Sequence, residues 1–242
     1  EIRFCDWSSD VCSSDLAYVA SHDLKAPLRV IDNASRWLEE DLDDKLTEED
    51  RENMTLLRGR VKRMEKLLDD LLEYSRIGRA IDGRCQEIVT GDRLVEEVLM
   101  LLDPPESMRV NISDNFKTIS VIRMPLQQVL HNLINNAIKH HDRENGTIEL
   151  AVIEAGDWLH FAVCDDGPGI PEEFREKIFE MFHTLKPRDQ VEGSGMGLAL
   201  VKKAVEHFGG RVTVSAGRTR GAEFTFSWPK RQPINHASEK AA

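Results

Sequence analysis

Cysteine and aromatic residues are scarce in this chain of 242 residues. The four cysteines form no Cys-x-x-Cys pair, so we expect reduced thiols of a cytoplasmic protein, not a disulfide framework or a zinc site. Aromatic residues make up 6% of the sequence, which leaves no obvious stacking platform for nucleic-acid bases. Apolar runs are short, and none approaches the roughly 20 residues that a membrane-spanning helix requires. Membrane attachment of a longer native chain stays open.

Positive charge is scarce as well. The chain has 32 lysines and arginines against 43 aspartates and glutamates, which gives a formal net charge of −11. This charge would repel a phosphate backbone, so we expect no nucleic-acid partner. Over the whole chain, 40% of residues are hydrophobic and 31% are charged, the composition of an ordinary globular protein with one or two domains.

The first fifteen residues differ from the rest of the chain. The stretch 8–12 nearly repeats at 13–16, is polar and has no helical or strand period. It resembles translated adapter DNA, so we interpret 1–15 as a non-native or disordered leader. The alternative is a linker from an upstream sensor domain that is missing from this chain. At the other end, 231–242 form a polar tail.

Two long amphipathic helices are predicted between residues 16 and 78. Apolar residues recur at helical spacing from 16 to about 41, and again from about 48 to 77. Between them lies a polar turn at 43–46, and Thr47 with Asp50 matches a capping box. A lone hairpin cannot cover both apolar stripes, so we expect a homodimer with a four-helix bundle. A coiled-coil spacer is the alternative.

The first helix carries a candidate nucleophile, His22, beside Asp23. Imidazole is a good nucleophile near neutral pH, and a carboxylate can hold the ring in one tautomer. Because neighbours on a helix point about 100° apart, Asp23 can reach only Nδ1, which leaves Nε2 free to attack. Pro27 predicts a bend just after His22, either a tolerated kink or a weak point that lets the histidine swing.

A second domain at 85–230 follows a polar, glycine-bearing linker at 79–84. Its shorter periodic segments predict an α+β domain. The expected strands are 86–89, one near 110, 119–121, 147–153, 158–163, 211–215 and 223–228, and the expected helices are 92–102, 125–140 and one that ends near 208.

The helix at 125–140 carries a polar stripe of Asn132, Asn136 and Lys139, spaced i, i+4 and i+7. Asparagine is a poor helix former, and a solvated stripe would favour Glu, Lys or Gln. Carboxamide oxygens can bind Mg²⁺ and amides can donate to phosphate oxygens. The stripe therefore predicts either a solvated face or a nucleotide site, and the residues alone leave both open.

Two glycine segments follow, at 165–169 and 193–197. An Asp-x-Gly-x-Gly turn lets backbone approach a ligand, and a glycine-rich loop before a helix suits an anion. Neither is specific alone, and the second is not a Walker A motif, since no Lys-Ser/Thr follows it. Between them, Lys186 and Arg188 lie on a candidate mobile lid, or on an ordinary surface loop.

Taken together, these segments resemble the sensor histidine kinases of two-component systems. The stretch 21–28 is similar to their H box, 132–139 to the N box, 165–169 and 193–197 to the two glycine boxes, and 178–182 to the F box. The likeness spans about 17–229. It implies a dimeric phosphotransfer hairpin followed by an α/β sandwich ATP-binding domain with a mixed sheet, of the gyrase-like ATPase superfamily.

The resemblance also implies roles for single residues. His22 would take the γ-phosphoryl group of ATP with Asp23 as general base, and pass it to an Asp of a response regulator. Asn136 would hold Mg²⁺, with Asn132 and Lys139 near the phosphates, and Asp165 would read adenine. The other residues expected at the nucleotide are His140, Gly167, Gly169, Ile170, Lys186, Arg188, Gly193, Gly195, Met196, Gly197 and Leu198.

The sequence departs from the family pattern at three positions. Ala26 stands where many members carry Thr or Asn to position water, which predicts weak phosphatase activity toward the regulator. Asp166 replaces a frequent Asn, and His140 replaces an aromatic residue. Two rival functions are an ATP hydrolase of the same superfamily and a non-enzymatic dimeric scaffold. The hydrolase would need an acid before Asn132 on the same helix, where the sequence has Gln127 and Gln128.

Overall fold

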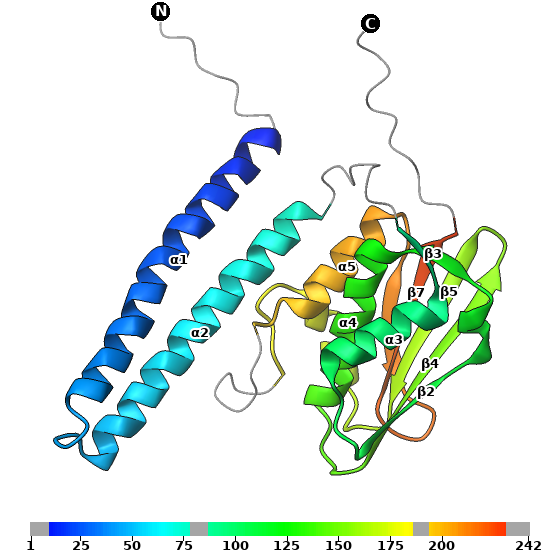
Figure 1. Ribbon diagram of the computed structural model, residues 1–242. Helices are drawn as coiled ribbons and strands as arrows, with labels where there is room; N and C mark the ends of the chain where they lie inside the picture. Colours follow the sequence, from blue (N-terminus) through cyan, green and yellow to red (C-terminus); the bar gives the residue numbers. More distant parts are fainter. Residues whose placement is uncertain (1–9, 78–86, 186–193, 231–242) are drawn as a thin grey trace, which may run out of the picture. The chain divides into compact units, whose positions relative to one another are not determined.

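The computed structural model describes residues 10–77, 87–185 and 194–230, with side chains from Asp23 onward. The chain divides into two compact units, one formed by the two N-terminal helices up to Arg76 and one that starts at Ile77. Figure 1 shows the helical hairpin and the α/β unit. The expected linker at 79–84 and the polar tail at 231–242 lie outside the described residues. Among those that are described, no helix has the length and apolar character to cross a membrane.

The hairpin consists of α1 (Asp10–Asp41) and α2 (Glu48–Arg76), which pack side by side (Figure 1). Helix α1 begins six residues before the predicted start and continues through Pro27. The predicted capping box is confirmed at the start of α2. The Thr47 N–H donates to Asp50 Oδ2 at 2.9 Å, and the Asp50 N–H donates to Thr47 Oγ1 at 3.2 Å.

The two helices bury only a narrow seam between them. Leu28 and Val61 are buried there, and the ion pairs Lys25–Asp69 and Arg58–Glu39 join the helices beside it. Other apolar side chains stay exposed and recur every seven residues on each helix: Leu24, Ile31 and Leu38 on α1, and Leu57, Met64 and Leu71 on α2. A single hairpin therefore leaves a continuous apolar stripe uncovered.

The second unit is built on a five-stranded mixed sheet in the order β2-β4-β5-β7-β6. Strand β2 runs parallel to β4, and the other pairs are antiparallel. A separate antiparallel pair joins β1 to β3. The strands are β1 (Ile88–Thr90), β2 (Met108–Ile112), β3 (Ser120–Ile122), β4 (Gly146–Ala155), β5 (Trp158–Asp165), β6 (Val212–Ala216) and β7 (Ala222–Pro229).

Three helices pack against the buried face of this sheet (Figure 1). They are α3 (Gly91–Leu102), α4 (Arg123–Lys139) and α5 (Gly197–His207). Alternate residues of β7 are buried, as expected for a sheet with one covered face. The unit is thus the expected α/β sandwich. Three short 3₁₀ helices were not predicted: η1 (Asp114–Lys117), η2 (Glu172–Phe174) and η3 (Lys177–Phe179).

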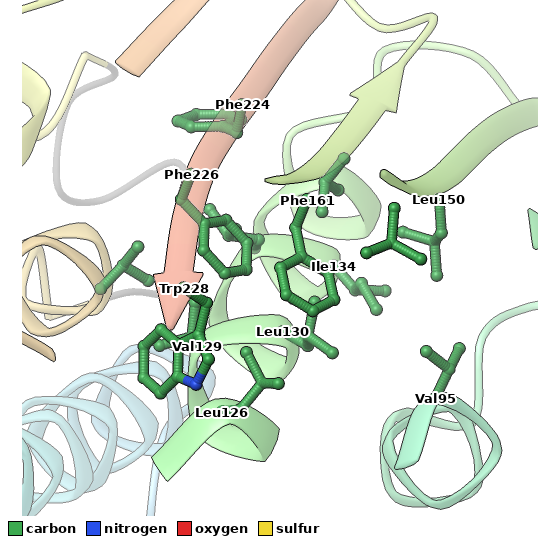
Figure 2. Packing of buried hydrophobic residues seen from close by; sticks show 14 of the residues in the cluster. Val95, Leu126, Val129, Leu130, Ile134, Leu150, Phe161, Phe224, Phe226 and Trp228 are labelled. Carbon is green, nitrogen blue, oxygen red and sulfur yellow. The ribbon is translucent and has the colours of Figure 1, made fainter. Parts of the chain in front are cut away.

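The core lies between α4 and the central strands, where Figure 2 shows large apolar side chains packed together. Phe161 of β5 stacks on Phe226 of β7, with ring centroids 4.9 Å apart. Leu130 and Ile134 of α4 are fully buried in the same cluster. Because α4 carries the polar stripe on its other side, this packing sets the position of Asn132 and Asn136.

Truncation of this core tests its contribution to stability. We expect Phe161→Ala to lower the free energy of unfolding by about 3–5 kcal/mol, since the change removes a fully buried ring and leaves a cavity. Urea denaturation of the full chain, followed by tryptophan fluorescence, measures it. Ile153→Ala is the control on the open face of β4, with an expected loss below about 1 kcal/mol. Equal losses in both variants would contradict this account of the core.

Candidate functional site

The polar stripe of α4 is only partly solvated. Asn132 and Asn136 are half-buried, and Lys139 is exposed one turn further on. The stripe lies toward the start of α5, since a Cβ added to Gly197 would come within 3.2 Å of Asn132 Oδ1. The proximity of Asn132 to Gly197 favours a nucleotide site over a solvated face as the interpretation of this stripe.

The start of α5 is a tight backbone arrangement that needs glycine. Gly195 has φ +72°, and a Cβ there would lie 2.9 Å from the Phe182 carbonyl carbon. The Phe182 N–H donates to the Gly195 carbonyl at 2.9 Å, and Met196 is fully buried before the helix. Since the first N–H groups of a helix have no partner within the helix, this end of α5 suits an anionic group beside Asn132.

Asp165 ends β5 and organises the first glycine loop. Its Oδ1 accepts hydrogen bonds from the Gly167 N–H at 2.9 Å and from the Ala222 N–H at 3.3 Å. Burial of this carboxyl raises the pKa of Asp165, against the effect of the two N–H donors. Both bonds use Oδ1, and among the described residues no donor meets Oδ2. The second oxygen can therefore accept from a ligand amine.

Gly221, at the turn before β7, lies directly against the backbone and side chain of Asp165. Its φ is +85°, and a Cβ there would collide with the backbone carbonyl and Oδ1 of Asp165. Only glycine therefore lets the turn lie against the end of β5. The sequence analysis missed Gly221, because nothing near it in the sequence points to Asp165.

The other predicted site residues lie in four described segments, except for three that fall outside the described residues. Gly167, Gly169 and Ile170 lie in the loop after β5, and His140 caps the end of α4. Leu198 lies in the first turn of α5 and, like Ile170, packs against the core. Asp23 is exposed on α1, which also contains His22, whose side chain is not described. Lys186, Arg188 and Gly193 lie outside the described residues.

The donor set fits magnesium held mainly by a nucleotide. Among the described residues, no group of three or more His, Cys, Asp or Glu side chains could hold a metal ion. Mg²⁺ often takes one or two protein oxygens and completes its octahedron with phosphate oxygens and water. Asn136 offers one such oxygen, from a half-buried position on the face that carries Asn132.

Two family models match the two units of the chain. Residues 13–80 match the His Kinase A (phospho-acceptor) domain. Residues 121–232 match the model described as histidine kinase-, DNA gyrase B-, and HSP90-like ATPase. Together they cover the hairpin and most of the α/β unit.

Curated relatives match along most of this chain. Cyanobacterial phytochrome B of Nostoc sp. is 35% identical over 216 residues, which cover 87% of this chain and 28% of the relative. The methanogenesis regulatory histidine kinase FilI of Methanothrix harundinacea is 31% identical over 216 residues, which cover 88% of this chain and 24% of the relative. The chain thus spans about a quarter of the length of these relatives.

Solved structures resemble the whole chain and the second unit. Full-length ShkA in complex with AMPPNP is 30% identical with a TM-score of 0.67, over 90% of this chain and 46% of that one. The catalytic domain of histidine kinase ThkA is 30% identical with a TM-score of 0.51, over 60% of this chain and 95% of that domain.

Proposed function

This chain belongs to the sensor histidine kinase family, of which it forms a catalytic core, and from that premise we propose that it phosphorylates itself on His22 with ATP and then transfers the phosphoryl group to an aspartate of a response regulator. The ATP would be bound by the second unit and the acceptor carried by the hairpin.

One observation carries the nucleotide part of this proposal. Asn132, on the helix of the N box, lies against Gly197, where the second glycine box enters α5. Two segments 65 residues apart are thereby brought to one place, with an amide side chain and a helix N-terminus available for phosphates. Asp165, at the end of β5, would accept a hydrogen bond from the adenine amine.

The phosphoryl step requires little beyond positioning. The Nε2 lone pair of neutral His22 attacks the γ-phosphorus, the bond to the β–γ bridging oxygen breaks, and ADP leaves. The proton on Nδ1 passes to Asp23 as the ring becomes cationic. Catalysis then rests on alignment by Asn132 and the start of α5, and on charge neutralisation by Lys139. Mg²⁺, held by Asn136, would neutralise the phosphate charge.

Labelling with ATP tests this function against its rivals. Incubation of the purified chain with γ-labelled ATP and Mg²⁺ should place an acid-labile, base-stable mark on the protein. Release of labelled phosphate without a mark would instead support the hydrolase. Binding of ATP with neither outcome would support the scaffold. The described part of α4 offers Gln127 and Gln128 but no acid before Asn132, which disfavours the hydrolase.

The hairpin supports the proposed homodimer. Its uncovered apolar stripe repeats every seven residues on both helices, as in helices that pack against a second pair. The response regulator would dock beside the same hairpin, near His22. If the hairpin were only a coiled-coil spacer, it would also pair with a second hairpin, but the ATP-binding unit would then have no role.

A charge in the apolar stripe should separate the dimer. We expect Met64→Glu, alone or with Ile31→Glu, to shift the chain from dimer to monomer, because a carboxylate would be buried without a partner. Light scattering coupled to size exclusion measures the mass. Lys62→Glu, on the exposed side of α2, is the matched control and should leave a dimer. A wild-type chain that is monomeric at all concentrations would contradict the proposal.

A further inference from the structure

An ion pair lies between the end of α4 and the first glycine loop, outside the predicted site. His141 Nε2 is 2.9 Å from Asp166 Oδ1, and the His141 side chain is only 2% exposed. The same oxygen accepts from the Thr147 N–H at 2.7 Å. These contacts join three segments: the turn after α4, the start of β4 and the loop after β5.

A second set of contacts joins the turn after α4 to the loop after β5. Arg220, in the turn between β6 and β7, forms an ion pair with Asp142, and its Nη1 also donates to the Asp166 carbonyl at 3.3 Å. The turn after α4 is thus bonded to the Asp166 region twice, once through His141 and once through Arg220. Asp165 and Gly167, the neighbours of Asp166, are the residues at the adenine side of the proposed site.

We propose that His141 and Asp166 form an ion pair, with the histidine buried and the carboxylate partly exposed, that positions the nucleotide site by tying the end of the helix that carries Asn136 to the loop that carries Asp165 and Gly167. His141 is a positioning residue and touches no substrate. This inference rests on the proposed function, since it concerns how the same site is held in shape.

The ring has partners in two protonation states. When neutral with its proton on Nε2, it donates to Asp166 and its Nδ1 accepts from the Arg143 N–H, 3.2 Å away. When protonated, it donates at both nitrogens, to Asp166 and to the Arg143 carbonyl, 3.0 Å from Nδ1. The bond to Asp166 therefore persists in both states. The carboxylate makes it charge-assisted in the first, and in the second both partners are charged and form an ion pair.

The surrounding charges favour the protonated state. Burial opposes protonation, but the bonds to Asp166 and the Arg143 carbonyl, with the charges of Asp166 and Asp142, outweigh it and raise the pKa of His141. Burial also opposes ionisation of Asp166, yet the donors Thr147 and His141 lower its pKa. Asp165, Arg220 and Arg143 are further charged groups around this pair.

The pair is therefore fully charged between the lowered pKa of Asp166 and the raised pKa of His141. The ion pair stabilises the folded state fully when the pH lies below the ordinary pKa of histidine, about 6.5, and above the ordinary pKa of aspartate, about 3.9. It weakens as the pH rises through the raised pKa of His141, or falls through the lowered pKa of Asp166. The affinity for nucleotide should therefore fall as the pH rises through the raised pKa of His141.

The test compares ADP binding by the wild-type chain and Asp166→Asn across pH 6 to 9, by calorimetry with Mg²⁺. The asparagine can still accept from Thr147 and His141 but carries no charge. We expect the variant to bind ADP about fivefold more weakly at pH 6 and less than about twofold more weakly at pH 9, where only the carboxylate is charged. Because both proteins meet the same ADP at each pH, the ratio of dissociation constants cancels the titration of the nucleotide.

Two further variants separate positioning from general damage. His141→Gln keeps a donor near Nε2 without a titrating ring, so its affinity relative to wild type should also change with pH, while its labelling rate at saturating ATP stays within about twofold of wild type. His160→Gln, which changes an exposed histidine on the open face of β5, should behave as wild type at every pH.

A ratio for Asp166→Asn that is the same at pH 6 and pH 9 would overturn the inference and leave the proposed function intact. Absence of ADP binding by the wild-type chain at any pH would overturn the proposed function itself.

Discussion

Replacement of His22 by alanine should abolish labelling of the chain by γ-labelled ATP. The proposed acceptor is the imidazole of His22, and a bond between an imidazole nitrogen and phosphorus is acid-labile and base-stable. ADP should still bind with wild-type affinity, because the residues proposed to bind the nucleotide belong to the second unit. Labelling at saturating ATP, measured beside calorimetric ADP binding, separates loss of the acceptor from loss of the site.

Asp23→Asn refines this result. Loss of the general base should slow labelling by about 100-fold or more without loss of ADP binding. His160→Gln is the matched histidine control and should label as wild type. Persistence of the acid-labile mark in His22→Ala would move the acceptor elsewhere. Co-expressed His22→Ala and Asn136→Ala subunits then show whether the phosphoryl group crosses the dimer, since only the Asn136→Ala subunit could be labelled in trans.

The contiguous patterns of the sequence predicted most of the fold. Helical periodicity indicated both long helices of the hairpin, and the Thr47–Asp50 spacing predicted a capping box whose bonds the structure contains. Alternation of apolar residues predicted the β4–β5 hairpin and the last two strands. These elements could be predicted because each one leaves a local pattern in the sequence, either within a single turn or as apolar residues that repeat along one face.

Features that depend on distant partners could not be read in the same way. The parallel pairing of β2 with β4 joins segments separated by a helix. His141 and Asp166 are 25 residues apart, and Arg220 lies 54 residues beyond Asp166. The sequence analysis noted Asp166 as a departure without a role, and no local spacing links it to a histidine. Such contacts are products of the tertiary fold, so they become visible only with coordinates.

The early start of α1 has a different cause. The stretch at 10–15 has no apolar period, which is why the prediction began at residue 16, yet the helix begins at Asp10. Periodicity reports an amphipathic face, and a segment can extend a helix without having one, because propagation adds a hydrogen bond per residue once the helix exists.

Asp165→Asn should lower affinity for ADP about 100-fold, the largest effect we expect within the nucleotide site. The amide oxygen can keep both backbone bonds, from Gly167 and Ala222, so the turn should hold its shape. The amide nitrogen then replaces the oxygen that would accept from the adenine amine, and two donors face each other. Guanine carries an acceptor at the same position. The variant should therefore lose its preference for ADP over GDP.

This change in selectivity is the decisive measurement, because damage to the loop would weaken both nucleotides alike. Calorimetry with ADP and GDP, each with Mg²⁺, gives the two dissociation constants for the wild-type chain and the variant. Asp157→Asn, in the exposed turn between β4 and β5, should leave both constants unchanged. If ADP and GDP weaken in parallel in Asp165→Asn, the carboxylate only supports the turn, and the adenine must be recognised by another group. If the ratio changes, Asp165 reads the base directly, and the two backbone donors on Oδ1 are what leave Oδ2 free to do so.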